Sequence, residues 1–190
     1  MRRSLQAAVL ALVLCPVAAR AQVRGLRLEG GPAFLTKSGA IALGPSAIES
    51  DSGFALRGRI RYGLGPVSIG ADVQSSNQKY GTPAAPGAPD TLDATFVGAV
   101  GALHPFKLGG IAPYGEIGLG RLFFGDEKID TQNGSKASSY GLGVVLGGEG
   151  RVALDVGLRL MRLQGLTARG VVGEFKYDPK LFSVLLSLKL

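Results

Sequence analysis

Apolar residues recur at every second position over long stretches of this 190-residue chain. The sequence RVALDVGLRLMRL at residues 151–163, for example, has an aliphatic residue at every even position from Val152 to Leu160. A β-strand sends successive side chains to opposite faces, and helical spacing of three or four residues is scarce here. The alternation predicts an all-β protein with eight strands, at residues 23–35, 53–63, 67–76, 91–103, 111–123, 139–148, 151–163 and 180–190.

The lengths of these segments and of their connections narrow the fold class. The segments are roughly 10–13 residues long, whereas strands of soluble proteins average about 5–6 residues and tilted membrane-crossing strands need about 9–11. Long connections alternate with tight ones, and in an up-and-down sheet this puts every long loop at one end, as in outer-membrane barrels. The long connections are residues 36–52, 77–90, 125–137 and 164–179, and the tight ones are 63–66, 104–110 and 148–150.

The N-terminus has the pattern of a secretory signal peptide. Two arginines precede an apolar stretch at residues 7–14, and Ala19-Arg20-Ala21 fits an A-x-A cleavage site. We expect a signal peptide at 1–21 and one barrel domain at 22–190. Removal of the signal peptide lowers the formal net charge from +7 to +4 and takes away Cys15, so the mature barrel has no disulfide. A lipoprotein anchored through Cys15 is the alternative, although Leu14 before it is not small.

Three arginines share one face of the second predicted strand. Arg57, Arg59 and Arg61 alternate with apolar residues that include Leu56 and Ile60. An eight-stranded barrel is just wide enough to be filled by its own side chains, so the charged face is expected inside and the apolar face against lipid. With Leu64-Gly65 as the turn, Arg57 would lie opposite Asp72.

Buried charges need partners, so the interior is expected to hold a hydrogen-bonded ionic network. Glu149 and Lys189 are further candidates for it. A sheet with a solvated basic face, as in a soluble protein, is the other interpretation of the same strand. The residues predicted to form the network are Arg57, Arg59, Arg61, Asp72, Glu116, Asp155 and Arg159.

Aromatic residues are expected in two bands at the ends of the strands, as in the girdles of membrane barrels. In this prediction only Phe96 lies in the middle of a strand. The band at the loop end contains Phe34, Phe54, Phe123, Phe124, Tyr140 and Tyr177, and the band at the turn end contains Tyr62, Phe106 and Tyr114.

The C-terminal segment LFSVLLSLKL alternates apolar residues from Phe182 to Leu190. It resembles the terminal signal read by the barrel-insertion machinery, although that signal usually ends in Phe or Trp rather than Leu. Over residues 22–190 the pattern resembles the small eight-stranded outer-membrane β-barrel family, the OmpA/OmpX-like, porin-type barrels. The resemblance implies a cell-envelope protein in the outer membrane of a Gram-negative-type cell. It also implies outer-membrane lipid, lipopolysaccharide and the insertion machinery as partners.

Other chemistry has little support in the sequence. His104 is the only histidine, and its turn LHPFK is expected at the surface, so neither a metal site nor a hydrolytic triad is predicted. Gly141 and Gly143 are two residues apart, so they would clear space on one face of a strand. Their surroundings do not have the glycine spacing of a nucleotide-binding loop. The basic residues show no pattern for nucleic acid. Loop cations, for example Lys79 and Lys136, suit either lipopolysaccharide phosphates or plain solvation.

We therefore expect a non-enzymatic barrel without cofactor or metal, acting in envelope structure or in surface interaction through four long external loops. One of these is the proline-rich stretch at 83–89, and nothing in the loops names a partner. The alternatives are a small-solute pore, a lipid A-modifying outer-membrane enzyme, and a soluble lipocalin-like binding barrel.

Overall fold

A computed structural model describes residues 23–36, 38–43, 46–80, 91–125, 134–147, 150–163 and 178–190. The expected signal peptide, the proline-rich stretch at 83–89, and Glu149 and Tyr177 lie outside these residues. Within the described part of the chain, no helix is long and apolar enough to span a membrane.

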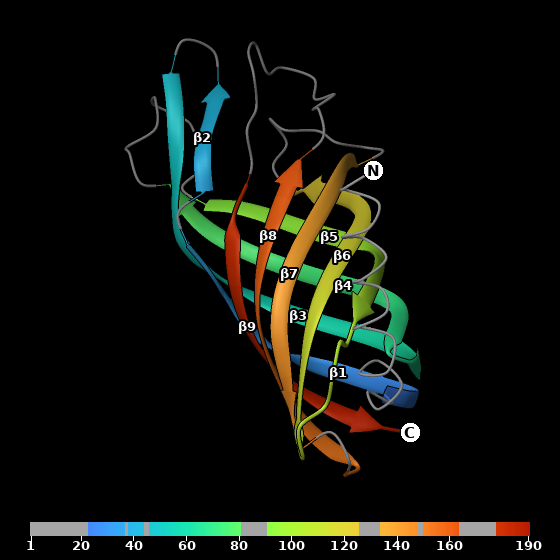
Figure 1. Ribbon diagram of the computed structural model, residues 1–190. Coiled ribbons are helices and arrows are strands. Elements are labelled where there is room, and N and C mark those ends of the chain that lie inside the picture. The colour runs from blue at the N-terminus through green and yellow to red at the C-terminus, as the bar shows by residue number, and fades with distance from the viewer. Residues whose placement is uncertain are drawn as a thin grey trace, which may run out of the picture.

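The described strands form one antiparallel sheet that closes on itself (Figure 1). From β2 to β9 each strand pairs with the next one in the sequence, and β1 closes the barrel by pairing with both β3 and β9. Because β2 pairs with β3 alone, the wall of the barrel has eight strands, as predicted. The strands are β1 (Val23–Leu35), β2 (Ser38–Leu43), β3 (Ser46–Gly65), β4 (Val67–Tyr80), β5 (Thr91–Leu103), β6 (Ile111–Phe124), β7 (Ser135–Leu146), β8 (Val152–Leu163) and β9 (Lys180–Lys189).

The strand limits agree with the sequence prediction at β1 and β5 and differ most at β3. That strand begins at Ser46 instead of residue 53, and its first part pairs with β2, which the sequence did not predict. Residues 46–53, SAIESDSG, mix small and acidic side chains without alternation. Strand pairing uses backbone hydrogen bonds, which need no particular side chain, so periodicity gave no sign of this hairpin.

The turn between β3 and β4 lies one residue later than expected. Gly63 is paired with Ser68 and not with Pro66, because the chain reverses at Gly65, whose φ of 94° suits a glycine. Arg59 therefore lies directly opposite Asp72, and the prediction of Arg57 in that place was wrong by two positions. A shift of two keeps every side chain on its predicted face.

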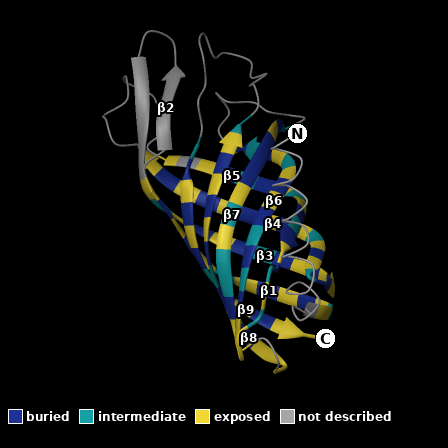
Figure 2. Cartoon of the chain, viewed as in Figure 1, coloured by how far each residue is buried: buried dark blue, intermediate teal, exposed yellow. Residues whose placement is uncertain are grey.

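Side chains alternate between the outside and the inside along the strands, as the blue and yellow bands in Figure 2 show. Leu56 and Ile60 on β3 are 61% and 51% exposed, whereas Arg59 between them is 2% exposed. Leu158 on β8 and Leu186 on β9 are exposed in the same way. The apolar face is thus the outer face, which a soluble barrel with an inward hydrophobic core would not present.

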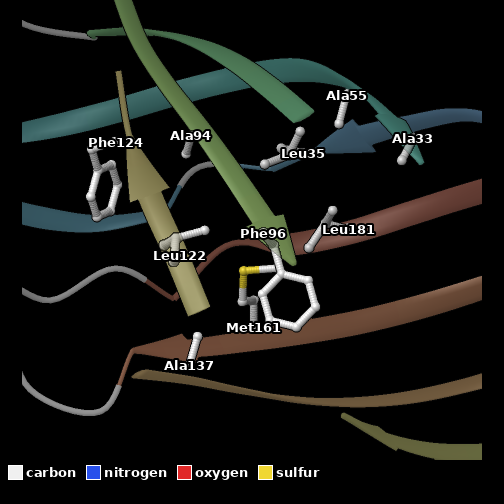
Figure 3. Close-up of a cluster of buried hydrophobic side chains, with 10 residues drawn as sticks. All are labelled: Ala33, Leu35, Ala55, Ala94, Phe96, Leu122, Phe124, Ala137, Met161 and Leu181. Atoms are coloured by element: carbon white, nitrogen blue, oxygen red, sulfur yellow. The ribbon is translucent and has the colours of Figure 1, made fainter. Parts of the chain in front are cut away.

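The interior is layered, and only its middle is ionic. Beside the strand ends that lead into the long connections, which we call the loop end, ten apolar residues pack together inside the barrel (Figure 3). We call this cluster the loop-end plug. The polar faces of the strands were expected inside, so this apolar cluster is a correction. Its members are Ala33, Leu35, Ala55, Ala94, Phe96, Leu122, Phe124, Ala137, Met161 and Leu181.

The aromatic bands are only partly as predicted. Phe34 and Phe54 lie on the outer face at the loop end and contact each other edge to face, with ring centroids 5.9 Å apart. Phe124 and Tyr114, however, are buried inside the barrel. Both share the inward face of β6 with Glu116, so alternation places them inside even though they lie near strand ends.

Candidate functional site

The middle of the barrel interior holds the ionic layer, which we define as four arginines and four carboxylates. Three of the arginines come from β3, because every second residue of that strand points inward. Their partners come from β1, β4, β6 and β8, and every side chain in the layer is at most 2% exposed. The members are Arg57, Arg59, Arg61, Arg159, Glu29, Asp72, Glu116 and Asp155.

Arg59 is the centre of the layer. Its Nε pairs with Glu29. Its Nη1 lies 2.6 Å from Oε2 of Glu116, and its Nη2 lies 2.6 Å from Oδ2 of Asp155. One guanidinium therefore joins carboxylates from three strands, β1, β6 and β8, across the barrel.

The other arginines extend the layer toward both ends. Arg57 Nη2 donates to Oδ2 of Asp72 at 2.7 Å and to Oε1 of Glu116 at 2.9 Å. Arg61 Nη2 reaches Oε1 of Glu29 at 2.5 Å and Oδ2 of Asp155 at 3.0 Å. Because Arg57 and Asp72 are bonded diagonally, the predicted pair forms despite the shifted register.

Arg159 closes the layer from the opposite wall. Its Nη1 donates to Oδ2 of Asp72 at 2.6 Å, and its Nη2 donates to Oγ of Ser139 at 2.5 Å. Four guanidinium groups thus meet four carboxylates, and the layer is electrically neutral. Since an unpaired buried charge costs several kcal/mol, this balance makes a charged layer tolerable in a barrel interior.

Tyr114 and Phe96 join the layer to its surroundings. The Tyr114 hydroxyl donates to Oδ1 of Asp155 at 2.6 Å, and the guanidinium of Arg61 lies 5.3 Å from the centroid of its ring. The guanidinium of Arg159 lies 5.0 Å from the ring centroid of Phe96, which belongs to the loop-end plug. Each of the two contacts between a guanidinium and an aromatic ring stabilises the fold by about 0.5–2 kcal/mol.

Glycines on β7 make room for the large side chains of β6. A Cβ at Gly141 would come within 2.8 Å of Cγ of Glu116, and a Cβ at Gly143 would overlap the ring of Tyr114. The alternate glycines therefore serve packing, which is the interpretation the sequence favoured over a nucleotide loop.

The structure places all seven predicted network residues in this layer and adds one that the prediction missed. Glu29 accepts bonds from Arg59 and Arg61. It lies on the inward face of β1, between the outward Leu28 and Gly30, so alternation alone could have found it. Lys189 was a wrong candidate, because it is exposed at the last position of β9, where the barrel opens.

His104 was expected at the surface and is instead fully buried. It continues the inward alternation of β5, and its backbone N–H bonds the carbonyl of Pro66 at 2.7 Å, which draws it into the turn end. Its Nε2 lies 3.3 Å from Oγ of Ser68, and its Nδ1 bonds to no described residue. Burial, and secondarily the charge of Arg61, lowers the pKa of His104 to about 4.

Ligand chemistry is limited in the described residues. They contain no group of three or more His, Cys, Asp and Glu side chains arranged to hold a metal ion. The carboxylates of the ionic layer are all bonded to arginines, so their oxygens are already occupied by hydrogen bonds. The layer is consequently a structural ionic network in its observed state.

Comparison with known proteins gives the fold. No protein-family model matches the chain, and no curated protein matches its sequence. Among solved structures it is similar to Neisserial surface protein A, with a TM-score of 0.59 and 18% identity, covering 87% of this chain and 97% of that one. It is also similar to the outer-membrane protein OprG of Pseudomonas aeruginosa, with a TM-score of 0.57 and 16% identity, covering 90% and 98%. The chain therefore has the fold of the small eight-stranded outer-membrane barrels.

Proposed function

We propose that this protein is an integral outer-membrane barrel that neither conducts solutes nor catalyses a reaction, and that presents its loop end at the cell surface. Envelope structure and surface interaction are the roles that this placement serves. The single observation that carries the proposal is the combination of an apolar outer wall with an interior that is filled by the ionic layer and the loop-end plug.

The outer wall suits hydrocarbon. Large apolar side chains such as Leu142, Ile117 and Leu158 are 71%, 63% and 64% exposed, and the charges of the same strands lie inside or at the strand ends. A charged side chain on the lipid face near the midplane costs about 2–4 kcal/mol, so this distribution favours a membrane over water.

The interior opposes passage of solutes in two ways. The ionic layer fills the middle of the barrel with bonded side chains, and the loop-end plug covers it with Phe96, Leu122 and Met161, each at most 1% exposed. An eight-stranded barrel has room for little beyond its own side chains. A small-solute pore would need both layers to rearrange.

The absence of catalysis is proposed from the setting of His104. Its partner Ser68 is also fully buried, so neither side chain of this Ser–His pair is open to a substrate. A hydrolytic triad further needs an acid on the second ring nitrogen, and Nδ1 has no bond to a described residue.

We further propose that β9 is the strand read by the barrel-insertion machinery. It closes the barrel between β8 and β1, and its outward face carries Phe182, Leu186 and Leu188. This is the alternating apolar pattern that the C-terminal sequence showed.

Location and folding can be tested together. The mature protein should fractionate with outer membranes and migrate faster on a gel before boiling than after. A protein found in the soluble fraction without detergent would contradict the proposed location.

The sealed interior can be tested in planar bilayers. The folded protein should show no single-channel steps, and incubation with lipid A should release no acyl chains. Steps whose size changes in Arg57→Ala would instead support a pore, and released fatty acid would support an enzyme.

A further inference from the structure

A buried histidine fastens the turn end of the barrel. His104 directly follows β5, at the first residue of the connection to β6, and its side chain is fully buried. Its backbone N–H donates to the carbonyl of Pro66 at 2.7 Å, and its Nε2 lies 3.3 Å from Oγ of Ser68. Its ring packs against that of Tyr114, with the two centroids 5.5 Å apart. One residue thus joins the end of β5 to the β3–β4 turn, to β4 and to β6.

The connection that begins at His104 can move without disturbing the sheet. Residues 104–107 belong to no strand. The bridge between Leu108 and Ile111 that follows is local to the start of β6, and Gly109 makes the reversal with a φ of 56°. A displacement of residues 104–107 therefore breaks the contacts of His104 but none of the strand pairings described here.

A positive charge on the ring would be opposed in this place. The charged and titratable groups that face it are Arg59 and Arg61 on β3, Arg27 on β1, Asp155 on β8 and Tyr114 on β6. The one carboxylate among them already accepts bonds from two arginines and from the tyrosine hydroxyl. The second ring nitrogen, Nδ1, bonds to no described residue. Burial, and secondarily the charge of Arg61, accordingly keeps the pKa of His104 at about 4, below the ordinary 6.5.

The loop end of the interior has no group of this kind. The ten members of the loop-end plug are Ala, Leu, Phe and Met residues, and none of these side chains titrates. His104 is the only histidine of the chain, and histidine is the residue type whose ordinary pKa lies between pH 5 and 8. Mild acid should therefore act on the turn end of the barrel and leave the loop-end plug in place.

From this arrangement we propose that His104 is an acid-released latch, whose ring takes up a proton, leaves the interior together with residues 105–107, and admits water from the turn end as far as the ionic layer. Loss of the proton to water closes the latch again. Because the loop-end plug stays in place, the open form has a water-filled recess at one end and is not a pore. The latch adds a conformational switch to the proposed function and does not depend on which side of the membrane the turn end faces.

The experiment measures backbone amide exchange by NMR in the full mature protein folded in detergent, between pH 7 and pH 4. Each rate is divided by the intrinsic rate at the same pH. The reporter is the amide of His104, which is bonded to Pro66 only while the latch is closed. Since the pKa of the ring is about 4 in the closed form and 6.5 in water, protection of this amide should fall about a hundredfold between pH 7 and pH 4. The amide of Thr36, which bonds the carbonyl of Lys180 at the loop end, should keep its protection.

Two variants separate the proton from the contact. His104→Gln keeps a polar side chain that can bond Ser68 but does not titrate, so protection at position 104 should be equal at pH 7 and pH 4. Ser68→Ala removes the partner of Nε2 and keeps the ring, so protection should already be lower at pH 7 and should still fall in acid. Ser75→Ala, at an exposed serine on the same strand, is the matched control and should behave as the wild type.

No fall in the wild type, or an equal fall in the wild type and in His104→Gln, would overturn the latch. A fall shared by the amide of Phe96, in the middle of β5, would also overturn it, because acid would then unfold the strand instead of releasing its end. If His104→Gln does not fold, Ser68→Ala decides. Protection equal to that of the wild type at pH 7 would show that the contact between Ser68 and His104 does not hold the turn end closed.

Discussion

The ionic layer and the loop-end plug occupy the same barrel interior, yet they are held together by different physics. The layer depends on matched partners, because Arg59 alone serves Glu29, Glu116 and Asp155. The plug depends on filled volume, since its members need only apolar neighbours. The comparison teaches that a buried charge is specified by its partners across the barrel, whereas a buried apolar side chain is specified by the space around it.

The largest effect should come from removing the centre of the layer. Arg59→Met keeps an unbranched side chain but removes the guanidinium, which leaves three carboxylates short of a cation. We expect unfolding in urea to show a loss of about 3–5 kcal/mol, the usual cost of a broken buried pair. Arg24→Met, on an exposed arginine, is the control and should change stability little. Equal stability of the two variants would show that the layer is not held by matched charge.

A cavity in the loop-end plug should lower the free energy of unfolding somewhat less than Arg59→Met does. Leu122→Ala removes buried methyl groups from a residue that is 1% exposed, and should cost about 3 kcal/mol in the same urea experiment. Leu122→Met keeps the volume and should cost less than about 1.5 kcal/mol. If Met were as costly as Ala, volume would not be what the plug requires.

Acid should destabilise the turn end through His104. The ring stays neutral in the folded barrel because its pKa is lowered from 6.5 to about 4. The unfolded chain binds a proton near pH 6.5, so the unfolded state is favoured as the pH falls from 6.5 to 4. The stability contributed above pH 6.5 is lost across that window, by about 2–3 kcal/mol.

Unfolding of the wild type and of His104→Gln between pH 4 and 7 measures this contribution. The variant should show a flatter dependence on pH, because the remaining titrating groups are common to both proteins. If the free energy of unfolding depended on pH equally in the two proteins, the pKa of His104 would be the same in the folded and unfolded states.

The smallest effect is expected at the edge of the layer. Tyr114→Phe removes the hydroxyl that donates to Asp155 but leaves the ring and both arginine partners of that carboxylate. The expected loss is about 1–2 kcal/mol, as for one hydrogen bond to a charged group. A loss as large as that of Arg59→Met would show that the hydroxyl, rather than the guanidinium groups, holds Asp155.

Much of the fold followed from alternation alone, and so did the membership of the ionic layer. Arg57, Asp72 and Asp155 were placed inside by counting every second residue, and Glu29 could have been placed in the same way. The plug was not foreseen because Leu122 and Met161 lie on inward faces that were assumed to be polar. His104 was misplaced because a turn was equated with the surface.

The sequence by itself determined that each strand has one apolar and one polar face, because a period of two allows only two faces. Tertiary structure decided the rest. Closure of the barrel brings β3 opposite β6 and β8, which lets Arg57 meet Glu116 and Arg59 meet Asp155 over a long separation in the chain. Turn geometry at Gly65 set the register between Arg59 and Asp72. Neither relation can be read from periodicity, because partners across a barrel are chosen by strand order and stagger, which local residue patterns do not encode.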